Sequence, residues 1–470
     1  MSSSSRGNGT SDSSRSQPPG HPRRAFLASS AALLAGAVAA STAKAEQATS
    51  IAAPALKEPY SYERDPLLVS THPRIIKARD AALELLRPTS AQLQHGLELH
   101  RNSLVFDSYG FAPRASIDGD AVAAADAAGV TDLQLQDLRA ELSMTRAAKV
   151  PAEREEFLLA MQTAGVTCIF QNAGEESSNP MVLLKRLAHF TYLGDMLRDV
   201  LVRATLPQDI EAARAAGQHC LYLTGNGVPL PLDPGSVTAG FEFVRLFFEL
   251  GVRMMHLTYN RRNLLGDGCA EAANGGISDF GRAVIQEMNR VGVIVDVAHS
   301  GWQTSLEAAK ASSKPMVASH TTCTAVTHHI RSKPDEVIRA ICDTGGLIGI
   351  CWIPEFIGGN GDLTGVIQHI DYAVKKFGID HVAVGTDIAH TSQYAAEQDA
   401  KVKTRGRREV RFASLWPPRA LGGKWPGAAS LTWTNWPLLT VGLVQKGYSD
   451  TDIQKILGGN IMRVCKDVLS

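Results

Sequence analysis

The sequence predicts an α/β fold, a (β/α)8 barrel with helical extensions at its N- and C-terminal ends. Short runs of aliphatic and β-branched residues recur eight times after residue 103, which is typical of buried parallel strands. Amphipathic segments of helical length separate these runs, and eight strand–helix alternations close such a barrel. Length alone does not decide between one large barrel and several domains, because 470 residues would also suffice for about three ordinary domains.

The eight predicted strands are each four to six residues long, and most end at a polar residue or a glycine. They are Ser103–Phe106, Thr167–Gln171, Cys220–Leu223, Met254–Thr258, Gly292–Val297, Pro315–Ser319, Leu347–Cys351 and His381–Val384. Helices are predicted between the later strands, at Phe280–Arg290, Gln303–Ala311, Asp335–Asp343 and Thr364–Phe377. Active sites of these barrels lie at the C-terminal ends of the strands, so we expect the chemistry there.

The barrel is expected to occupy residues 103–470, preceded by a helical extension at 46–102. Four helices are predicted outside the strand–helix alternation, at Pro73–Leu86, Ser90–Leu99, Pro437–Lys446 and Ser449–Gly458. The segment Lys401–Lys424 is basic and interrupted by Gly and Pro, which predicts a solvated surface loop. A lid or an interface is the alternative for this segment.

The first 45 residues have the composition of an export signal. A disordered Ser-, Gly- and Arg-rich leader precedes the twin arginines Arg23-Arg24, an apolar run follows at 31–40, and Ala-Lys-Ala at 43–45 is a small-x-small cleavage site. The apolar run is shorter than the roughly 20 residues of a membrane-spanning helix, which argues against an anchor. We therefore expect a twin-arginine signal peptide at 1–45 and a periplasmic or extracellular protein.

The charge balance argues against partners that are bound by bulk electrostatics. The chain has 47 Lys and Arg against 47 Asp and Glu, and the predicted signal holds five of the former and one of the latter. The remaining chain has 42 basic and 46 acidic residues, a formal charge of −4. We expect a small-molecule or dipeptide substrate, no nucleic acid and no transmembrane segment in the mature chain; a homodimer stays open. Seven scattered cysteines without a CxxC pair indicate neither a disulfide framework nor a structural zinc site.

Three polar side chains follow predicted strands at the rim where chemistry is expected. His299 and His320 come just after the fifth and sixth predicted strands, and Asp387 follows the last. Because neighbouring parallel strands end at one rim, we expect the two imidazoles to lie together, as metal binding requires. Asp387 suits ligation or general-base catalysis, and helix capping is its structural alternative.

Long, ordered motifs around these residues resemble the membrane (renal) dipeptidase family. They are ELGVRMMHLTYNRRNLLGDGCAE, GGISDFGRAVIQEMNRVGVIVDVAHS, SHTTCTAVTHHIRSKPDEVIRAICDTGGLIGI, VGTD and KGYSDTDIQKILGGNIMRV. The resemblance covers the chain from Ser103 to Val464. It implies a (β/α)8 metallohydrolase with two zinc ions that cleaves dipeptides, including some with a D-residue at the C-terminal position.

The resemblance also implies roles for five residues of this chain. His299 and His320 match, including their spacing, the two late histidines that bind one zinc ion. Arg331 matches the arginine that grips the substrate carboxylate, a task that suits a planar guanidinium. Asp387 matches the carboxylate that takes and delivers protons at the scissile nitrogen. Tyr259 stands in place of a histidine that contacts the substrate, and its hydroxyl can still donate a hydrogen bond.

The early half of the family's site is changed. Tyr109 and Phe111 stand where a His-x-Asp pair would bind the other zinc ion, and Thr224 stands near the place of a bridging Glu. Phenylalanine offers no ligand atom, and a tyrosine must lose a proton with a pKa near ~10 to bind as phenolate. A third ligand from Asp387 or Asp107 would complete a mononuclear site.

A literal His-x-Asp occurs at His369-Ile370-Asp371. It lies within the helix predicted before the last strand, so we expect it to be structural.

The sequence leaves three functions open. The first is an exported metal-dependent dipeptidase, or a related amide hydrolase for small carboxylate-bearing substrates, with one or two zinc ions. The second is a catalytically impaired homologue that binds small peptides or amino-acid derivatives. The third is another reaction of such barrels with one metal, such as lactam opening. Joint retention of the two histidines, Arg331 and Asp387 favours the first, whereas the three replaced positions favour the second.

Overall fold

The computed structural model describes residues 60–174, 179–231, 237–402, 413–418 and 420–469. Residues Ala53–Ser470 form one compact unit. The predicted signal at 1–45, and much of the predicted basic loop at 401–424, lie outside the described residues. The boundaries expected at 45/46 and 102/103 therefore stay predictions.

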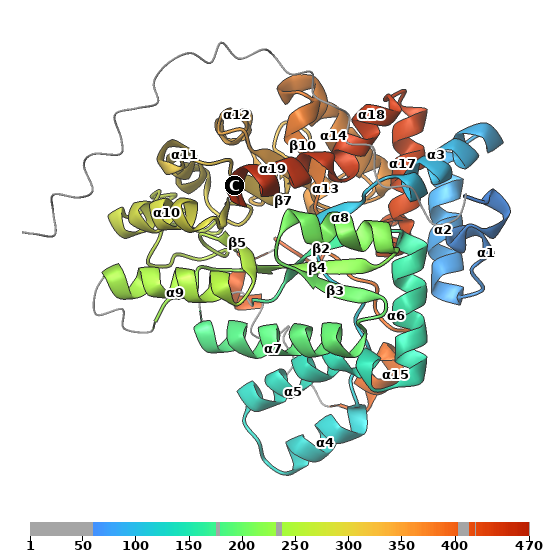
Figure 1. The fold of residues 1–470 in the computed structure, drawn as a ribbon, viewed down its shortest axis with the longest axis horizontal. Coiled ribbons are helices and arrows are strands. Elements are labelled where there is room, and N and C mark those ends of the chain that lie inside the picture. The colour runs from blue at the N-terminus through green and yellow to red at the C-terminus, as the bar shows by residue number, and fades with distance from the viewer. Residues whose placement is uncertain (1–59, 175–178, 232–236, 403–412, 419, 470) are drawn as a thin grey trace, which may run out of the picture. The chain divides into compact units, whose positions relative to one another are not determined.

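Eight parallel strands form the barrel, in the order β1-β2-β4-β5-β6-β7-β9-β10. They are β1 (Phe106–Gly110), β2 (Cys168–Asn172), β4 (His219–Gly225), β5 (Val252–His256), β6 (Ile294–Asp296), β7 (Val317–Cys323), β9 (Leu347–Ile350) and β10 (Val382–Val384). Almost all of their residues are buried, because helices cover the outside of the barrel (Figure 1). The predicted (β/α)8 fold is confirmed.

The structure differs from the predicted strands in their number and in several of their bounds; β7, for example, continues to Cys323, so His320 lies within a strand that the sequence predicts to end at Ser319. The structure adds β3 (Leu201–Ala204), which pairs with β4 beside the barrel path, and the two-residue β8 (Ser332–Lys333), which pairs with β7. The first barrel strand begins at Phe106, where the predicted strand ended. Hydropathy misplaced this strand because its next two residues, Asp107 and Ser108, are polar and yet buried.

These two polar residues join β1 to β10, where the barrel closes. Ser108 Oγ donates to the Val384 carbonyl at 2.9 Å. The Asp107 carboxylate accepts from the Thr386 backbone N–H at 2.9 Å, the Thr386 hydroxyl at 2.5 Å and Trp433 Nε1 at 3.1 Å. Burial raises the pKa of Asp107 to about 7 in spite of these bonds. Asp107 is thus engaged in closing the barrel.

Helices surround the barrel strands (Figure 1). They are α4 (Gly119–Ala127), α5 (Asp132–Thr145), α6 (Pro151–Ala164), α7 (Pro180–Met196), α8 (Pro207–Ala216), α9 (Val237–Glu249), α10 (Asp279–Val291), α11 (Trp302–Ala311), α12 (Asp335–Asp343), α13 (Pro354–Ile357), α14 (Leu363–Phe377) and α15 (Ala395–Ala400). In α10, the Ser278 hydroxyl accepts from the Gly281 N–H at 2.9 Å, and Gly292 ends the helix with φ 97°. The buried face of α10 carries Val284 and Met288, which places its apolar stripe on the barrel.

Helices from both ends of the described chain pack together. They are α1 (Pro66–Val69), α2 (Pro73–Leu86) and α3 (Ser90–Asn102) at one end, and α17 (Trp436–Gln445), α18 (Asp450–Gln454) and α19 (Asn460–Leu469) at the other. Helix α3 lies against α17 (Figure 1), so closely that a Cβ atom on Gly96 would lie 2.7 Å from Val441 Cα. His100 Nδ1 bonds Thr440 Oγ1 at 2.8 Å across the same contact. The predicted helical extensions therefore contact each other through α3 and α17.

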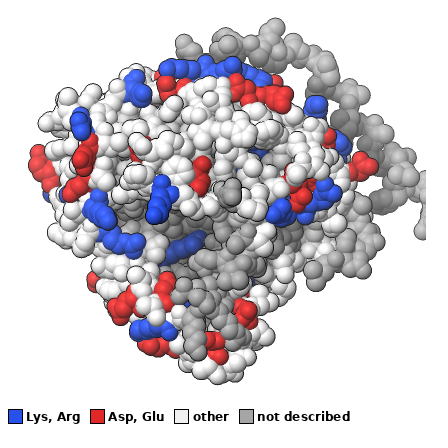
Figure 2. All heavy atoms as spheres, turned by 180° about the vertical axis from the view of Figure 1, so that it is seen from behind, with Lys and Arg blue, Asp and Glu red and all other residues white. Residues whose placement is uncertain are grey.

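The surface shows mixed charge. On the face shown in Figure 2, Lys and Arg side chains are interspersed with Asp and Glu, as the balanced composition leads one to expect. Among the described residues, no helix is both long and apolar enough to cross a bilayer.

Candidate metal centre

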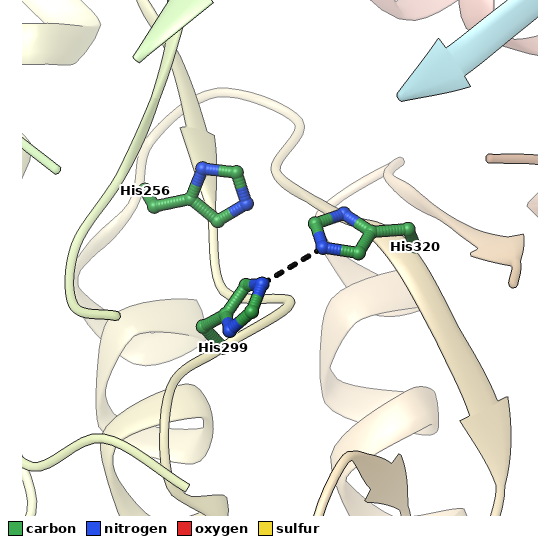
Figure 3. Close-up of side chains that lie close together, drawn as sticks. All are labelled: His256, His299 and His320. Atoms are coloured by element: carbon green, nitrogen blue, oxygen red, sulfur yellow. Dashed lines mark hydrogen bonds between the residues drawn. The ribbon is translucent and has the colours of Figure 1, made fainter. Parts of the chain in front are cut away.

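Three histidines converge at the C-terminal rim of three neighbouring strands. His256 is the last residue of β5, His299 lies just beyond β6, and His320 lies within β7. One ring nitrogen from each lies within 4.8 Å of those of the other two, and the rings lie next to one another in Figure 3. The Nε2 atoms of His299 and His320 are 2.9 Å apart. The structure thus brings the two predicted histidines together and adds a third.

The Nδ1 atom of each ring, its outer nitrogen, is hydrogen-bonded to an oxygen atom. The pairs are His256 Nδ1 with the Gly225 carbonyl at 3.0 Å, His299 Nδ1 with Asn260 Oδ1 at 2.7 Å, and His320 Nδ1 with Ser319 Oγ at 2.8 Å. Because carbonyl and amide oxygens only accept, Nδ1 donates in His256 and His299, and Nε2 is the ring atom of each that could bind a metal. Anchoring of the outer nitrogen in this way is typical of metal-binding histidines.

Burial favours the neutral rings that a metal requires. His299 and His320 are 3% and 0% exposed. Desolvation lowers the pKa of both rings well below the usual value, and the nearby Arg331 lowers it further. Neutral imidazole is the form that ligates a metal ion.

A carboxylate lies beside the third histidine. His256 Nε2 is 3.0 Å from Asp296 Oδ2, and both side chains are fully buried. The two atoms pair with each other, and neither has a further hydrogen-bond partner in the part of the chain that the structure describes. Burial alone would raise the pKa of Asp296, but His256 and hydrogen bonds around the carboxyl hold it below the usual value. A negative charge therefore lies next to the ring nitrogen of His256.

Together these features fit a divalent metal ion. The three imidazoles supply the nitrogen ligands that zinc and similar ions prefer. Asp296, whose carboxylate lies 3.0 Å from His256 Nε2, adds a negative charge beside them.

Asp387 follows β10 and keeps an unusual backbone conformation. Its φ is 57°, a left-handed value that costs energy in a residue other than glycine, and its N–H donates to the Tyr109 carbonyl. The residue is partly exposed. Desolvation raises the pKa of its carboxyl to about 6, although Arg331 and His256 act in the opposite direction. A carboxylate with this pKa suits proton transfer near neutral pH.

Tyr259 and Arg331 both contact the histidines. The Tyr259 ring stacks on that of His299, with centroids 4.1 Å apart, and the residue is partly exposed. Arg331 is 0% exposed. Its guanidinium donates to the Ala298 carbonyl, to the His320 carbonyl at 3.1 Å and to His299 Nε2 at 3.2 Å. Within the described part of the chain the Arg331 Nε–H has no acceptor, so one donor remains for a ligand.

The residues at the changed family positions make contacts of their own. The Tyr109 ring stacks on His320, with centroids 3.8 Å apart, and its hydroxyl donates to Asn226 Oδ1 at 2.5 Å. Phe111 lies edge-on to Tyr109 at 5.8 Å. Thr224 donates instead to a carbonyl of β5. The side chain that faces Tyr109 is therefore Asn226, two residues beyond the position compared with the bridging Glu.

His256 is not among the site residues predicted from the sequence, which indicates Asp107 or Asp387 as the third ligand. Neither carboxylate belongs to the group of three side chains that converge among the described residues. The position of His256 was obscured because the predicted strand Met254–Thr258 extends two residues beyond β5. A strand ending at His256 would have placed it on the same rim as His299.

The family comparison agrees with these motifs. The model of the membrane dipeptidase family (peptidase family M19) matches residues 123–401. This range includes the three histidines, Arg331 and Asp387, and it begins after β1.

Curated relatives are similar to the chain over part of its length. Dipeptidase verJ of Clonostachys rogersoniana is 28% identical over 228 residues, which is 48% of this chain and 50% of that protein. Dipeptidase tcpJ of Claviceps purpurea is 26% identical over 230 residues, or 48% and 47%. The match thus spans about half the length of these relatives.

Solved structures share the fold. An amidohydrolase from Pseudomonas aeruginosa has a TM-score of 0.60 at 24% identity, with 80% of this chain and 99% of that chain covered. A metallo peptidase from Rhodobacter sphaeroides, liganded with a phosphinate mimic of the dipeptide L-Ala-D-Ala, has a TM-score of 0.55 at 16% identity, with 78% and 99% covered. Both likenesses support the barrel.

Proposed function

Because this chain belongs to the membrane dipeptidase family, whose members are metal-dependent hydrolases, we propose that it hydrolyses dipeptides or related small amides that carry a carboxylate. We further propose that it uses a zinc ion held by His299 and His320. The observation that carries this proposal is the pair of Nε2 atoms 2.9 Å apart, on rings whose outer nitrogens are anchored by oxygen atoms. That arrangement suits a metal ligand pair.

Each side chain around the pair has a distinct task in this proposal. A bound metal ion supplies Lewis acidity and lowers the pKa of a bound water toward ~7. Asp387, with its raised pKa, accepts a proton from the attacking water and returns it to the scissile nitrogen. Tyr259, stacked on His299, donates a hydrogen bond to the substrate. Asp387 and Tyr259 are partly exposed, so the substrate can reach them from the barrel mouth.

The proposal is tested on purified protein by elemental analysis and by assays on a dipeptide panel with and without added zinc. We expect bound metal and turnover that a chelator removes. The alternative function, a catalytically impaired homologue that binds small peptides, is favoured by Tyr109 and Phe111 at family ligand positions. Metal near zero and no turnover, together with peptide binding by calorimetry, would establish that alternative.

Arg331 is proposed to bind the substrate carboxylate. Arg331→Ala is expected to raise KM by roughly 10- to 100-fold, because a hydrogen bond to a charged group contributes about 1.5–3 kcal/mol. The measurement compares each dipeptide with its C-terminal amide, which lacks the carboxylate. The wild type should prefer the dipeptide, and the variant should lose that preference.

Arg339→Ala, on α12, is the matched control for Arg331→Ala and should leave KM unchanged. Since Arg331 is buried, the thermal unfolding of both variants is recorded. A well-folded Arg331→Ala protein that still prefers the carboxylate would refute the role.

We also propose that the chain is exported by the twin-arginine route to the periplasm or beyond. The Arg23-Arg24 pair, the apolar run and the cleavage site support this proposal. Replacing both arginines with lysine and fractionating the cells tests it, because export should stop. Undiminished export would exclude this route.

A further inference from the structure

We propose that His256 is a third metal ligand and that the chain holds one ion, bound by His256, His299 and His320, in place of the two ions that family resemblance implies. This inference rests on the proposed function, and it names the ligand set of the same site.

The three histidine rings are arranged so that their nitrogens converge. They lie on the rims of β5, β6 and β7, which are adjacent in the barrel, and their ligand nitrogens are all within 4.8 Å of one another. Nitrogens bound at about 2.0–2.1 Å to one tetrahedral ion are separated by roughly 3.3 Å. The 2.9 Å between His299 Nε2 and His320 Nε2 is close to this separation, and a side-chain movement would bring the His256 nitrogen, which lies within 4.8 Å of both, to the same distance. Three histidines with water as the fourth ligand form a known catalytic zinc arrangement.

A buried carboxylate beside His256 favours a cation at this place. His256 Nε2 and Asp296 Oδ2 are 3.0 Å apart and fully buried, and neither atom has another hydrogen-bond partner among the described residues. A buried negative charge is costly to a folded protein unless a positive charge lies near it. A divalent ion at His256 Nε2 would supply that positive charge, and the carboxylate would offset the charge of the ion.

The contact between Tyr109 and Asn226 bears on the number of ions that the chain holds. The face of His320 is covered by the Tyr109 ring, whose hydroxyl is bound to Asn226. This contact joins β1 to the end of β4 at the level where the family resemblance expects ligands of a second ion. Neither the phenol nor the amide is anionic, and the converging group in the described chain includes no carboxylate. Among the described residues, a second divalent ion at this level would therefore find no cluster of anionic ligands.

The ion and Arg331 compete for one lone pair. His299 Nε2 accepts from the Arg331 guanidinium at 3.2 Å, and it cannot do so while it binds a metal. The guanidinium keeps its bonds to the Ala298 and His320 carbonyls, so it gives up one contact of three. Metal binding at His299 Nε2 would thereby free one donor of the Arg331 guanidinium.

The experiment measures metal binding directly. Wild type, His256→Ala and a control, His369→Ala, are stripped of metal and titrated with Zn²⁺ against a chromophoric chelator, and Co²⁺ is followed by its visible absorption. His369 is a buried histidine whose ring nitrogens bond Cys323 N and Ile357 O, away from the three-histidine group. Circular dichroism checks that each variant folds.

We expect one Zn²⁺ per chain in wild type and in His369→Ala. In His256→Ala the affinity should fall by at least about 100-fold, because even the loss of a residue behind a ligand costs 10- to 100-fold. The Co²⁺ absorption should lose the intensity of a low-coordinate nitrogen site. X-ray absorption of the zinc-loaded wild type should count three imidazoles, a result that does not depend on any variant folding.

Two results would overturn this inference and leave the proposed function standing. One is wild-type affinity in a folded His256→Ala protein, with two imidazoles counted by X-ray absorption, while turnover still depends on His320. The other is two bound ions per chain. A wild type that binds neither Zn²⁺ nor Co²⁺ overturns the inference and the proposed function together.

Discussion

Replacing His320 with alanine is expected to abolish metal-dependent hydrolysis, with a fall in kcat/KM of at least about 1000-fold. The metal contributes several kcal/mol to transition-state stabilisation, and each 1.36 kcal/mol corresponds to about tenfold in rate. His320 is fully buried, with Nε2 directed at His299, so no other side chain can take its place. Initial rates with the best dipeptide of the panel, together with zinc content, measure the effect.

A control variant that also removes an imidazole shows whether the effect is specific to His320. His95→Ala serves, because His95 is an exposed residue of α3 that pairs with Asp450 and lies far along the chain from the barrel rim. It should keep full activity and full zinc content. If His320→Ala retained both as well, hydrolysis through this centre would be excluded.

Asp387→Asn is expected to lower kcat by roughly 100- to 10,000-fold while KM and zinc content change little. General acid–base catalysis contributes that range, and an amide cannot carry the proton. Asparagine tolerates the left-handed backbone found at this position, so the substitution preserves the local structure. A fall in kcat without a change in KM distinguishes loss of proton transfer from loss of substrate binding.

The pH profile gives a second readout for Asp387. Burial raises the pKa of this carboxyl to about 6, and the group works as a base only when ionised. Wild-type kcat should therefore be maintained above about pH 6 and should fall as the pH drops below it. This acid limb should vanish in Asp387→Asn.

Asp380→Asn is the matched control for Asp387→Asn. Asp380 is an exposed carboxylate that pairs with Lys455 just before β10. Both kcat and the acid limb should persist in this control. Equal losses in both variants would assign the effect to local folding rather than to proton transfer.

Strand periodicity predicted the barrel because its strands are buried on both faces and so have uniformly apolar sequences. It failed at β1, where Asp107 and Ser108 are buried within the strand. Their polarity is compensated by bonds to Thr386 and Val384, more than 270 residues away in the chain. Such compensation is invisible to a local pattern.

Some residues of the candidate site could be predicted from the local sequence, and others could not. His299, His320 and Asp387 could be found because each follows an apolar run and lies in a long motif. His256 was missed because the apolar run around it continues through Leu257, which moved the predicted strand end beyond the histidine. Asn226 was missed because its importance comes only from the Tyr109 hydroxyl that contacts it.

The sequence by itself determined the fold class and the family, and it marked His299, His320 and Asp387 as candidate site residues, because periodicity and motif spacing are properties of the chain alone. The tertiary structure decided which side chains meet. It placed His256 beside His299 and His320, directed Asp107 to the barrel seam rather than to the three histidines, and set Tyr109 against Asn226. These choices depend on the register of parallel strands and on the burial of each polar atom. Both are fixed only when the barrel closes.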